Sequence, residues 1–134
     1  MKLKTVRNCH SKYSLNYHLI LVTKYRKECI TEEIFNFLKE HMIRIFKEYE
    51  IELIEMNYEA NHVHILFSAP PQVTLSKIIN TLKTTSSRKV RSNFKEHLDK
   101  YYWKPYFWSR SYLILSSGGA PIEIIKKYIQ EQNN

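Results

Sequence analysis

The chain has 134 residues, enough for one domain with one core, and its 21 Lys and Arg against 13 Asp and Glu give a net charge of +8. A small basic chain favours a polyanionic partner, most simply a nucleic acid and next an anionic membrane surface. The single Asp99 argues against a nuclease built on several metal-binding Asp carboxylates, and the lone pair Gly118-Gly119 against a Gly-rich nucleotide-binding loop.

The cysteines and the N-terminus predict a cytoplasmic, reduced protein. Cys9 and Cys29 are too few for the disulfide framework of a secreted domain. The first ten residues carry three basic side chains and no apolar run, so they do not resemble a signal peptide. No stretch approaches the length of a membrane span, and we expect no membrane partner.

Hydrophobic periodicity predicts an α+β fold. Alternating apolar residues indicate four strands, over residues 14–23, 51–58, 62–68 and 112–116. Apolar residues three and four apart indicate a helix from the capping Thr31 to about Glu50 and another after Thr74 through Leu82. Pro121 can begin a terminal helix that runs to about Gln132, whereas residues 83–104 show only weak periodicity.

The order of these elements predicts one domain over residues 1–134. The succession β-α-β-β-α-β is that of a ferredoxin-like or RRM-like antiparallel sheet with its helices on one side. The additional C-terminal helix, about residues 121–132, lies outside that succession.

Two histidines open the third predicted strand. Side chains alternate across a strand, so His62 and His64 point to one face while Val63 points to the other. Two neutral imidazoles at this spacing can share one divalent cation. The alternative is a pair of polar residues on a solvated sheet face.

Tyr128 and Gln132 are four residues apart in the terminal helix and therefore share one of its faces. The alternative is an amphipathic tail helix in which isoleucines pack and Tyr128 borders their stripe. Before this helix, Gly118-Gly119 is either a tight turn that needs positive φ or a hinge that lets the helix move.

Aromatic and basic residues alternate between Phe94 and Tyr112. Rings stack on unpaired bases and cations follow phosphates, as in single-strand binding proteins. The alternative is that the rings belong to the core, and we expect at least half of them to do so. The side chains that we expect to contact nucleic acid are Lys24, Arg26, Lys83, Arg88, Lys89, Arg91, Lys104 and Arg110.

Taken together, the motifs resemble one family. The run Asn61-His62-Val63-His64-Ile65-Leu66 is similar to the HUH motif, and residues 125–132 are similar to a helix that carries one reactive tyrosine. Further similar segments are residues 17–19, 22–26, 82–88 and 108–112. In order and spacing, nearly the whole chain resembles the single-tyrosine HUH transposases (TnpA-like) of the smallest insertion sequences.

The resemblance implies a mechanism. His62, His64 and Gln132 would bind one Mg²⁺ or Mn²⁺, and Tyr128 would attack single-stranded DNA to leave a 5′-phosphotyrosine and a free 3′-OH. It further implies DNA with subterminal hairpins, and a homodimer whose active sites combine the histidines of one subunit with the tyrosine helix of the other. Asn61 stands where the family usually has Asp, which removes a carboxylate that could orient a metal ligand.

Two other functions remain open. A non-catalytic, domesticated single-strand binder would use the same RRM-like sheet, although the four expected active-site residues are all present. A replication or conjugation nickase of the same superfamily is disfavoured by the small size and by the single tyrosine of the terminal helix. Because a phosphotyrosine keeps the energy of the broken phosphodiester, no nucleotide cofactor is expected.

Overall fold

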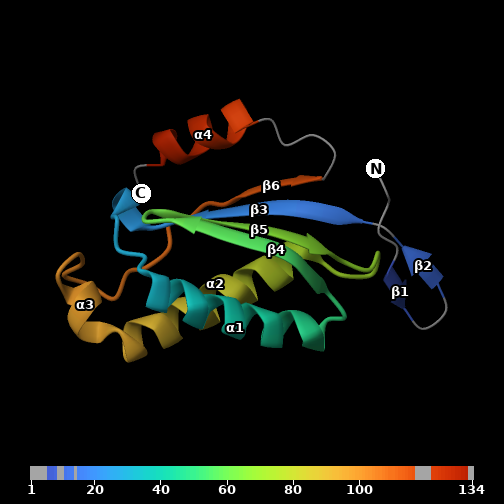
Figure 1. Ribbon diagram of the computed structural model, residues 1–134, viewed down its shortest axis with the longest axis horizontal. Helices are drawn as coiled ribbons and strands as arrows, with labels where there is room; N and C mark the ends of the chain where they lie inside the picture. Colours follow the sequence, from blue (N-terminus) through green and yellow to red (C-terminus); the bar gives the residue numbers. More distant parts are fainter. Residues whose placement is uncertain (1–5, 9–10, 14, 117–121, 133–134) are drawn as a thin grey trace.

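The computed structural model describes residues 6–8, 11–13, 15–116 and 122–132. Its centre is a four-stranded antiparallel sheet in the order β4-β5-β3-β6 (Figure 1). In chain order the elements are β1 (Val6–Asn8), β2 (Ser11–Tyr13), β3 (Asn16–Val22), η1 (Lys24–Arg26), α1 (Glu32–Glu48), β4 (Glu52–Glu59), β5 (His62–Ser68), α2 (Leu75–Asn93), α3 (Lys95–Asp99), β6 (Leu113–Ser116) and α4 (Ile122–Glu131). From β3 to β6 this succession confirms the predicted α+β, ferredoxin-like sheet.

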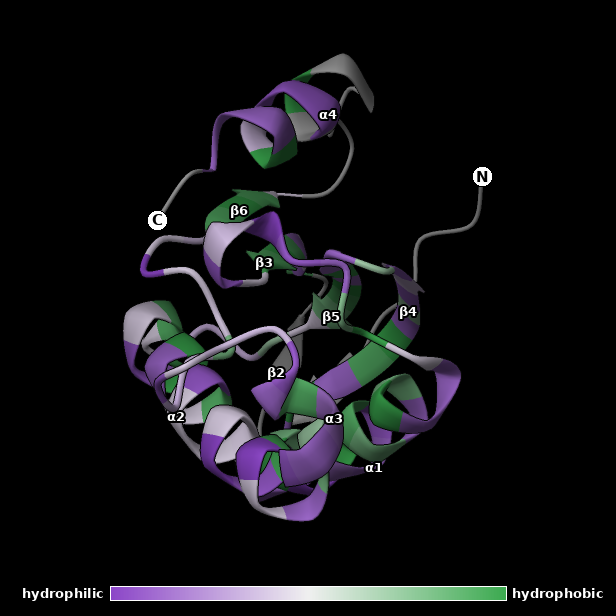
Figure 2. Cartoon of the chain, turned by 90° about the vertical axis from the view of Figure 1, so that its left-hand side faces the viewer, coloured by the Kyte–Doolittle hydropathy of each residue, from purple (hydrophilic) through white to green (hydrophobic). Residues whose placement is uncertain are grey.

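Helices α1 and α2 cover one face of this sheet. Helix α1 begins where expected, because the Thr31 hydroxyl accepts a hydrogen bond from the backbone N–H of Ile34 at 3.2 Å. Glu32 and Glu33 occupy its first turn, where negative charge opposes the positive end of the helix dipole. Figure 2 shows the hydrophobic sides of both helices turned inward toward the sheet and their polar sides turned outward.

Strand alternation separates the core from the second sheet face. Val63, Ile65 and Phe67 of β5 are fully buried in the core cluster that also contains residues of α1 and α2. His62 and His64 therefore point to the opposite face. Helix α4 lies over that opposite face (Figure 1). The extra helix and the two histidines thus occupy the same side of the sheet.

Among the described residues, the β1–β2 hairpin, η1 and α3 are elements that periodicity did not predict. Helix α2 also runs well past Leu82, to Asn93. Periodicity did not predict this continuation, because a polar residue interrupts the buried apolar stripe of the helix. Ser86 is fully buried, and its hydroxyl accepts a hydrogen bond from Trp108 Nε1 at 2.9 Å, so this polar position packs as part of the core. The predicted hinge or turn at Gly118-Gly119 lies outside the described residues.

Most rings of the aromatic stretch belong to the core, as expected. Tyr102, Phe107 and Trp108 are buried. Four more rings pack against the core, those of Phe94, Tyr101, Tyr106 and Tyr112. Trp103 differs from all of these because 71% of its surface is exposed. Within the part of the chain that the structure describes, no helix has the length and apolar character needed to cross a membrane.

His41 is a buried titratable group between α1 and α2. The Thr85 hydroxyl donates its hydrogen to the Thr81 carbonyl at 2.7 Å. It therefore accepts the hydrogen bond from His41 Nε2, also at 2.7 Å. Nδ1 is buried without a partner among the described residues. Burial lowers the pKa of His41, and the charges of Lys89, Arg44 and Arg88 lower it further.

We predict that folding stability falls as the solution becomes acidic and that His41 contributes to this fall. A histidine with a lowered pKa binds its proton more readily in the unfolded chain, so its stabilisation is complete above about pH 6.5 and is lost as the pH falls toward the folded-state pKa. His41→Gln keeps a donor for Thr85 and should reduce the loss between about pH 7 and pH 5. Urea unfolding midpoints of both proteins test this, and equal pH slopes would contradict it.

Candidate active site

His62 is held by its neighbour Asn61. The two side chains meet at 2.9 Å between His62 Nδ1 and Asn61 Oδ1. Because the carboxamide oxygen accepts, Nδ1 carries the hydrogen and the lone pair of Nε2 stays available for a cation. The backbone of Asn61 is itself fixed, since its main-chain carbonyl accepts hydrogen bonds from the backbone N–H of Thr23 at 3.0 Å and from the Thr23 hydroxyl at 3.2 Å. Asn61 therefore performs the orienting contact expected of an Asp, without its charge.

His64 contacts a third histidine, His18 of β3, which the sequence did not identify as a site residue. His18 Nδ1 lies 2.8 Å from His64 Nε2, and the two rings stack with their centroids 5.0 Å apart. When His64 donates in this hydrogen bond, its Nδ1 has a free lone pair. The contact depends on the register that places Ile20 opposite His64, and alternation within each strand predicts the faces of the side chains but not which residues pair across the strands.

Both histidines of β5 are in an environment that favours the neutral ring. Burial lowers the pKa of His62, with the carboxylate of Glu59 opposing the shift. Burial also lowers the pKa of His64, and His18 adds to this effect while Glu55 opposes it. Neutral imidazole is the form that binds metal ions.

Helix α4 carries Tyr128 and Gln132 into one hydrogen-bonded cluster. The Tyr128 hydroxyl donates to Ser111 Oγ at 3.1 Å. Ser111 Oγ donates to Gln132 Oε1 at 2.6 Å, and Ser109 Oγ donates to the same oxygen at 3.1 Å. The shared face predicted from the four-residue spacing therefore forms. The sequence did not identify the two serines, because their role depends on where α4 packs.

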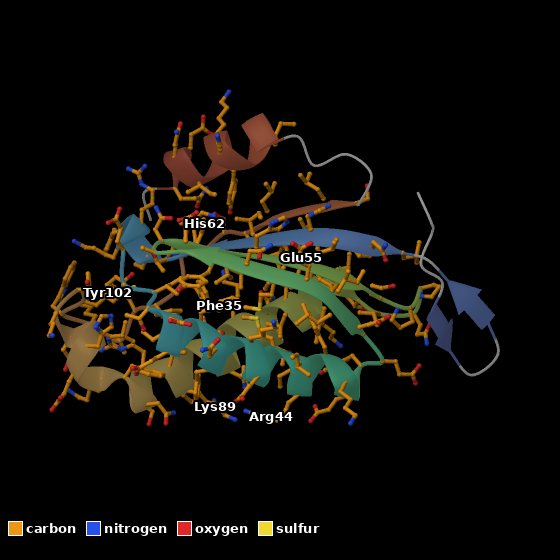
Figure 3. The ribbon with its side chains drawn as sticks, viewed as in Figure 1. Phe35, Arg44, Glu55, His62, Lys89 and Tyr102 are labelled. Carbon is orange, nitrogen blue, oxygen red and sulfur yellow. The ribbon has the colours of Figure 1, made fainter. Side chains whose placement is uncertain are left out.

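This cluster lies at the end of the sheet that carries His62. The backbone N–H of Ser109 donates to the carbonyl of Val22 at 2.7 Å, and Val22 is the β3 partner of His62. Arg26 Nη1 donates to the carbonyl of Gln130 at 2.7 Å and fixes the same end of α4. Figure 3 shows His62 between the sheet and α4. The structure thus brings the predicted metal ligands and the predicted nucleophile to one region.

The phenol of Tyr128 is protonated at neutral pH. Burial raises its pKa, and the hydrogen bond to Ser111 partly opposes this. Lys126 and Lys127 of the same helix are exposed. An attacking phenolate at this position therefore needs additional positive charge near the reacting phosphate.

The residue types fit a divalent cation. Imidazole nitrogens of His62 and His64 together with a carboxamide oxygen suit Mn²⁺ and, with water, Mg²⁺. Because Gln132 Oε1 already accepts hydrogen bonds from Ser109 and Ser111, it would exchange one of them for the cation. Among the described residues, no three His, Cys, Asp or Glu side chains form a group that could hold a metal. The predicted third ligand, Gln132, is of another residue type, and its role as a ligand stays a prediction.

The predicted nucleic-acid contacts separate into different regions. Arg91 is only 14% exposed and forms a 3.0 Å ion pair with Asp99, so it stabilises the α2–α3 junction. Lys83 Nζ donates to the Arg110 carbonyl at 2.6 Å, and Arg110 lies between the two serines that contact Gln132. Figure 3 shows Lys89, together with Arg44, on the side of α1 and α2 that faces away from His62.

The remaining predicted contacts also lie in different places. Lys104 and Arg110 are exposed, and Lys24 and Arg26 belong to η1. Arg88 is exposed on α2, where it lines one hollow with Arg44 and Lys89. Contact of any of these side chains with DNA stays a prediction.

Comparison with known proteins decides the family. The sequence model described as "Transposase IS200 like" matches residues 11–132, which is almost the whole chain. This chain belongs to the IS200-like transposase family. It is 33% identical over 122 residues to the ISDra2 transposase TnpA of Deinococcus radiodurans, covering 91% of this chain and 86% of the relative. A transposase of insertion sequence element IS200 from Salmonella typhimurium is 25% identical over 123 residues, 92% of this chain and 80% of the relative.

Solved structures agree with this family membership. A crystal structure from Deinococcus radiodurans R1, described as that of a transposase, matches with a TM-score of 0.84 and 30% identity over 96% of this chain and 98% of that one. A REP-associated tyrosine transposase bound to a REP hairpin matches with a TM-score of 0.54 and 10% identity, over 86% of this chain and 62% of that one. The second likeness concerns the fold alone. Membership in the family identifies the protein as a transposase of an insertion sequence, as its motifs predicted.

Proposed function

We propose that this transposase cleaves and rejoins single-stranded DNA at the ends of its insertion sequence through a 5′-phosphotyrosine on Tyr128. His62, His64 and Gln132 would hold one Mg²⁺ or Mn²⁺. The observation that carries this proposal is the shared cluster of Tyr128 and Gln132, at the sheet end that carries His62. Ser109 links the two groups, because it holds Gln132 through its hydroxyl and the β3 partner of His62 through its backbone.

The chemistry follows from the side chains present. Tyr128 Oη forms a bond to the scissile phosphorus while the bond from phosphorus to the 3′ oxygen breaks, and the phenol proton ends on the released 3′-OH. Ser111 holds the Tyr128 hydroxyl, and Asn61 and His18 orient the two imidazoles. When bound, the cation would act as a Lewis acid, because its positive charge stabilises the reacting phosphate.

The phosphotyrosine makes the reaction reversible without a nucleotide. Attack by the 3′-OH of another DNA end restores a phosphodiester and releases Tyr128. By resemblance to the family, the substrate carries subterminal hairpins and the enzyme is a homodimer with shared active sites. The tyrosine transposase that shares this fold and is bound to a REP hairpin is one support for hairpin recognition.

The decisive experiment asks whether a covalent intermediate forms. Labelled single-stranded oligonucleotides from the ends of the element are incubated with the protein, with and without Mn²⁺ or Mg²⁺. A detergent-stable protein–DNA adduct that requires the metal supports the proposal, and peptide mass spectrometry assigns the modified residue. DNA binding without any adduct would instead support a non-catalytic single-strand binder.

We predict that Asn61→Ala weakens Mn²⁺ binding by roughly ten- to a hundred-fold, because His62 Nδ1 loses the partner that fixes its ring. Asn61→Asp offers an oxygen to the same N–H and should bind Mn²⁺ at least as tightly as the wild type. Asn93→Ala is the matched control, since Asn93 Nδ2 donates to the carbonyl of Lys89 at 2.8 Å at the end of α2, away from the two histidines. Calorimetric titration measures all three, and equal affinity of Asn61→Ala and wild type would contradict the prediction.

A further inference from the structure

Two exposed rings stack on each other at one end of the molecule. Trp103 is 71% exposed and Tyr25 is 38% exposed. Their centroids are 5.8 Å apart and their planes are almost parallel, at 9°. Tyr106 packs edge-on against both rings, with centroids 5.9 Å from each. We name Tyr25, Trp103 and Tyr106 the aromatic platform.

The aromatic platform lies among cations. Lys24 Nζ is 5.3 Å from the centroid of Tyr25 and 4.9 Å from that of Tyr106. Lys27 and Lys104 are exposed beside it in the sequence. Aromatic faces flanked by cations bind unpaired bases and their phosphates in single-strand binding proteins. A dry protein–protein contact would instead be depleted of lysine.

The backbone under the aromatic platform is held in an unfavourable conformation. Tyr25 has φ 58° and ψ 19°, and Arg26 has φ 55°, both in the left-handed region that favours glycine. Lys24, the residue before Tyr25, is fixed at both of its backbone groups. Its N–H donates to the Phe107 carbonyl at 2.8 Å, and its carbonyl accepts from the Tyr102 hydroxyl at 2.7 Å. Backbone strain of this kind gathers at ligand-binding sites.

The aromatic platform adjoins the tyrosine helix. Arg26, the residue after Tyr25, donates to the carbonyl of Gln130 in α4 at 2.7 Å. Gln130 lies two residues from both Tyr128 and Gln132. In Figure 1, η1 lies below the C-terminal end of α4, at the end of the molecule where α3 is found. A DNA strand that leaves Tyr128 toward this end passes the exposed rings.

We infer that the aromatic platform stacks an unpaired base of the single-stranded DNA that flanks the cleaved phosphodiester. This inference rests on the proposed function for the identity of the strand. Trp103 provides the open ring face, Tyr25 supports it from behind, and the neighbouring lysines face the phosphates. The platform thereby fixes the strand on one side of the reacting phosphate without reading its sequence, since every base has a face that stacks.

Tryptophan fluorescence offers a direct test. The second tryptophan, Trp108, is only 8% exposed, so quenching on DNA binding reports mainly on Trp103. The probe is an oligonucleotide of about 20 thymidines, compared with a chain of the same length in which every base is replaced by an abasic site. We expect quenching by the thymidine chain and little by the abasic chain, which carries the same charge.

Variants measure the contribution of stacking. Trp103→Ala should weaken binding of the thymidine chain by roughly five- to a hundred-fold, and Trp103→Phe should recover most of the loss. Tyr49→Ala is the control, because Tyr49 is 41% exposed at the end of α1 and should bind like the wild type. Equal quenching by both probes, or wild-type affinity of Trp103→Ala, would overturn the inference.

Two further readouts distinguish base stacking from a subunit interface and from the cleavage reaction. A dimer that dissociates on Trp103→Ala, seen by sedimentation velocity, would make the rings a subunit interface and overturn the inference. Adduct formation by the wild-type protein tests the proposed function separately. If thymidines quench the fluorescence but no adduct forms, base stacking on the aromatic platform stands and the proposed function is overturned. If adducts form but Trp103→Ala binds DNA as tightly as the wild type, the proposed function stands and base stacking is overturned.

Discussion

Tyr128→Phe should abolish the covalent protein–DNA adduct and leave DNA affinity within about two-fold of the wild type. The change removes one oxygen atom, which donates to Ser111 in the free protein, and keeps the half-buried ring of α4. Phenylalanine has no nucleophilic atom, so no phosphotyrosine can form. The measurement is gel separation of labelled DNA in detergent, with affinity measured in parallel by fluorescence anisotropy.

A matched control comes from the segment that carries Ser111. Tyr112 follows Ser111 and its ring packs against the core, so Tyr112→Phe changes one hydroxyl close to the site but not the nucleophile. It should form adducts at close to the wild-type rate. If the Tyr128→Phe protein still forms adducts, another of the ten tyrosines is the nucleophile and the assignment of Tyr128 is wrong.

Features that depend on local periodicity could be predicted from the sequence. Strand β5 begins and ends where alternation placed it, at His62 and Ser68, and the alternation fixed which face carries the histidines. Thr31 caps α1 because its hydroxyl and the following acids act within one turn. These signals need no knowledge of which elements meet.

Features that depend on contacts between distant elements could not be predicted in this way. His18 touches His64 across 46 residues of sequence, through a register that hydrophobic alternation alone does not specify. Ser109 and Ser111 became site residues only because α4 packs over them. Arg91 carries the same charge as its exposed neighbours, yet its pairing with Asp99 depends on the angle between α2 and α3.

Mixing two inactive variants should restore DNA cleavage. His64→Ala removes a proposed metal ligand and Tyr128→Phe removes the nucleophile, so each homodimer should be inactive. In a heterodimer with active sites shared between subunits, one site combines the wild-type histidines of the Tyr128→Phe subunit with Tyr128 of the other. We expect co-expressed variants, separated by two affinity tags, to form adducts at up to about half the wild-type level per dimer.

The same mixture distinguishes a shared site from a site within one chain. In the structure, α4 packs over its own sheet through Arg26 and through Ser109 and Ser111. These are polar contacts to a single helix, so an identical helix from a second subunit can make each of them in the same way. If every site used its own helix, both sites of the heterodimer would lack one essential residue. An isolated heterodimer that binds DNA but forms no adduct would therefore assign Tyr128 to the histidines of its own chain, and adducts would assign it to those of the partner.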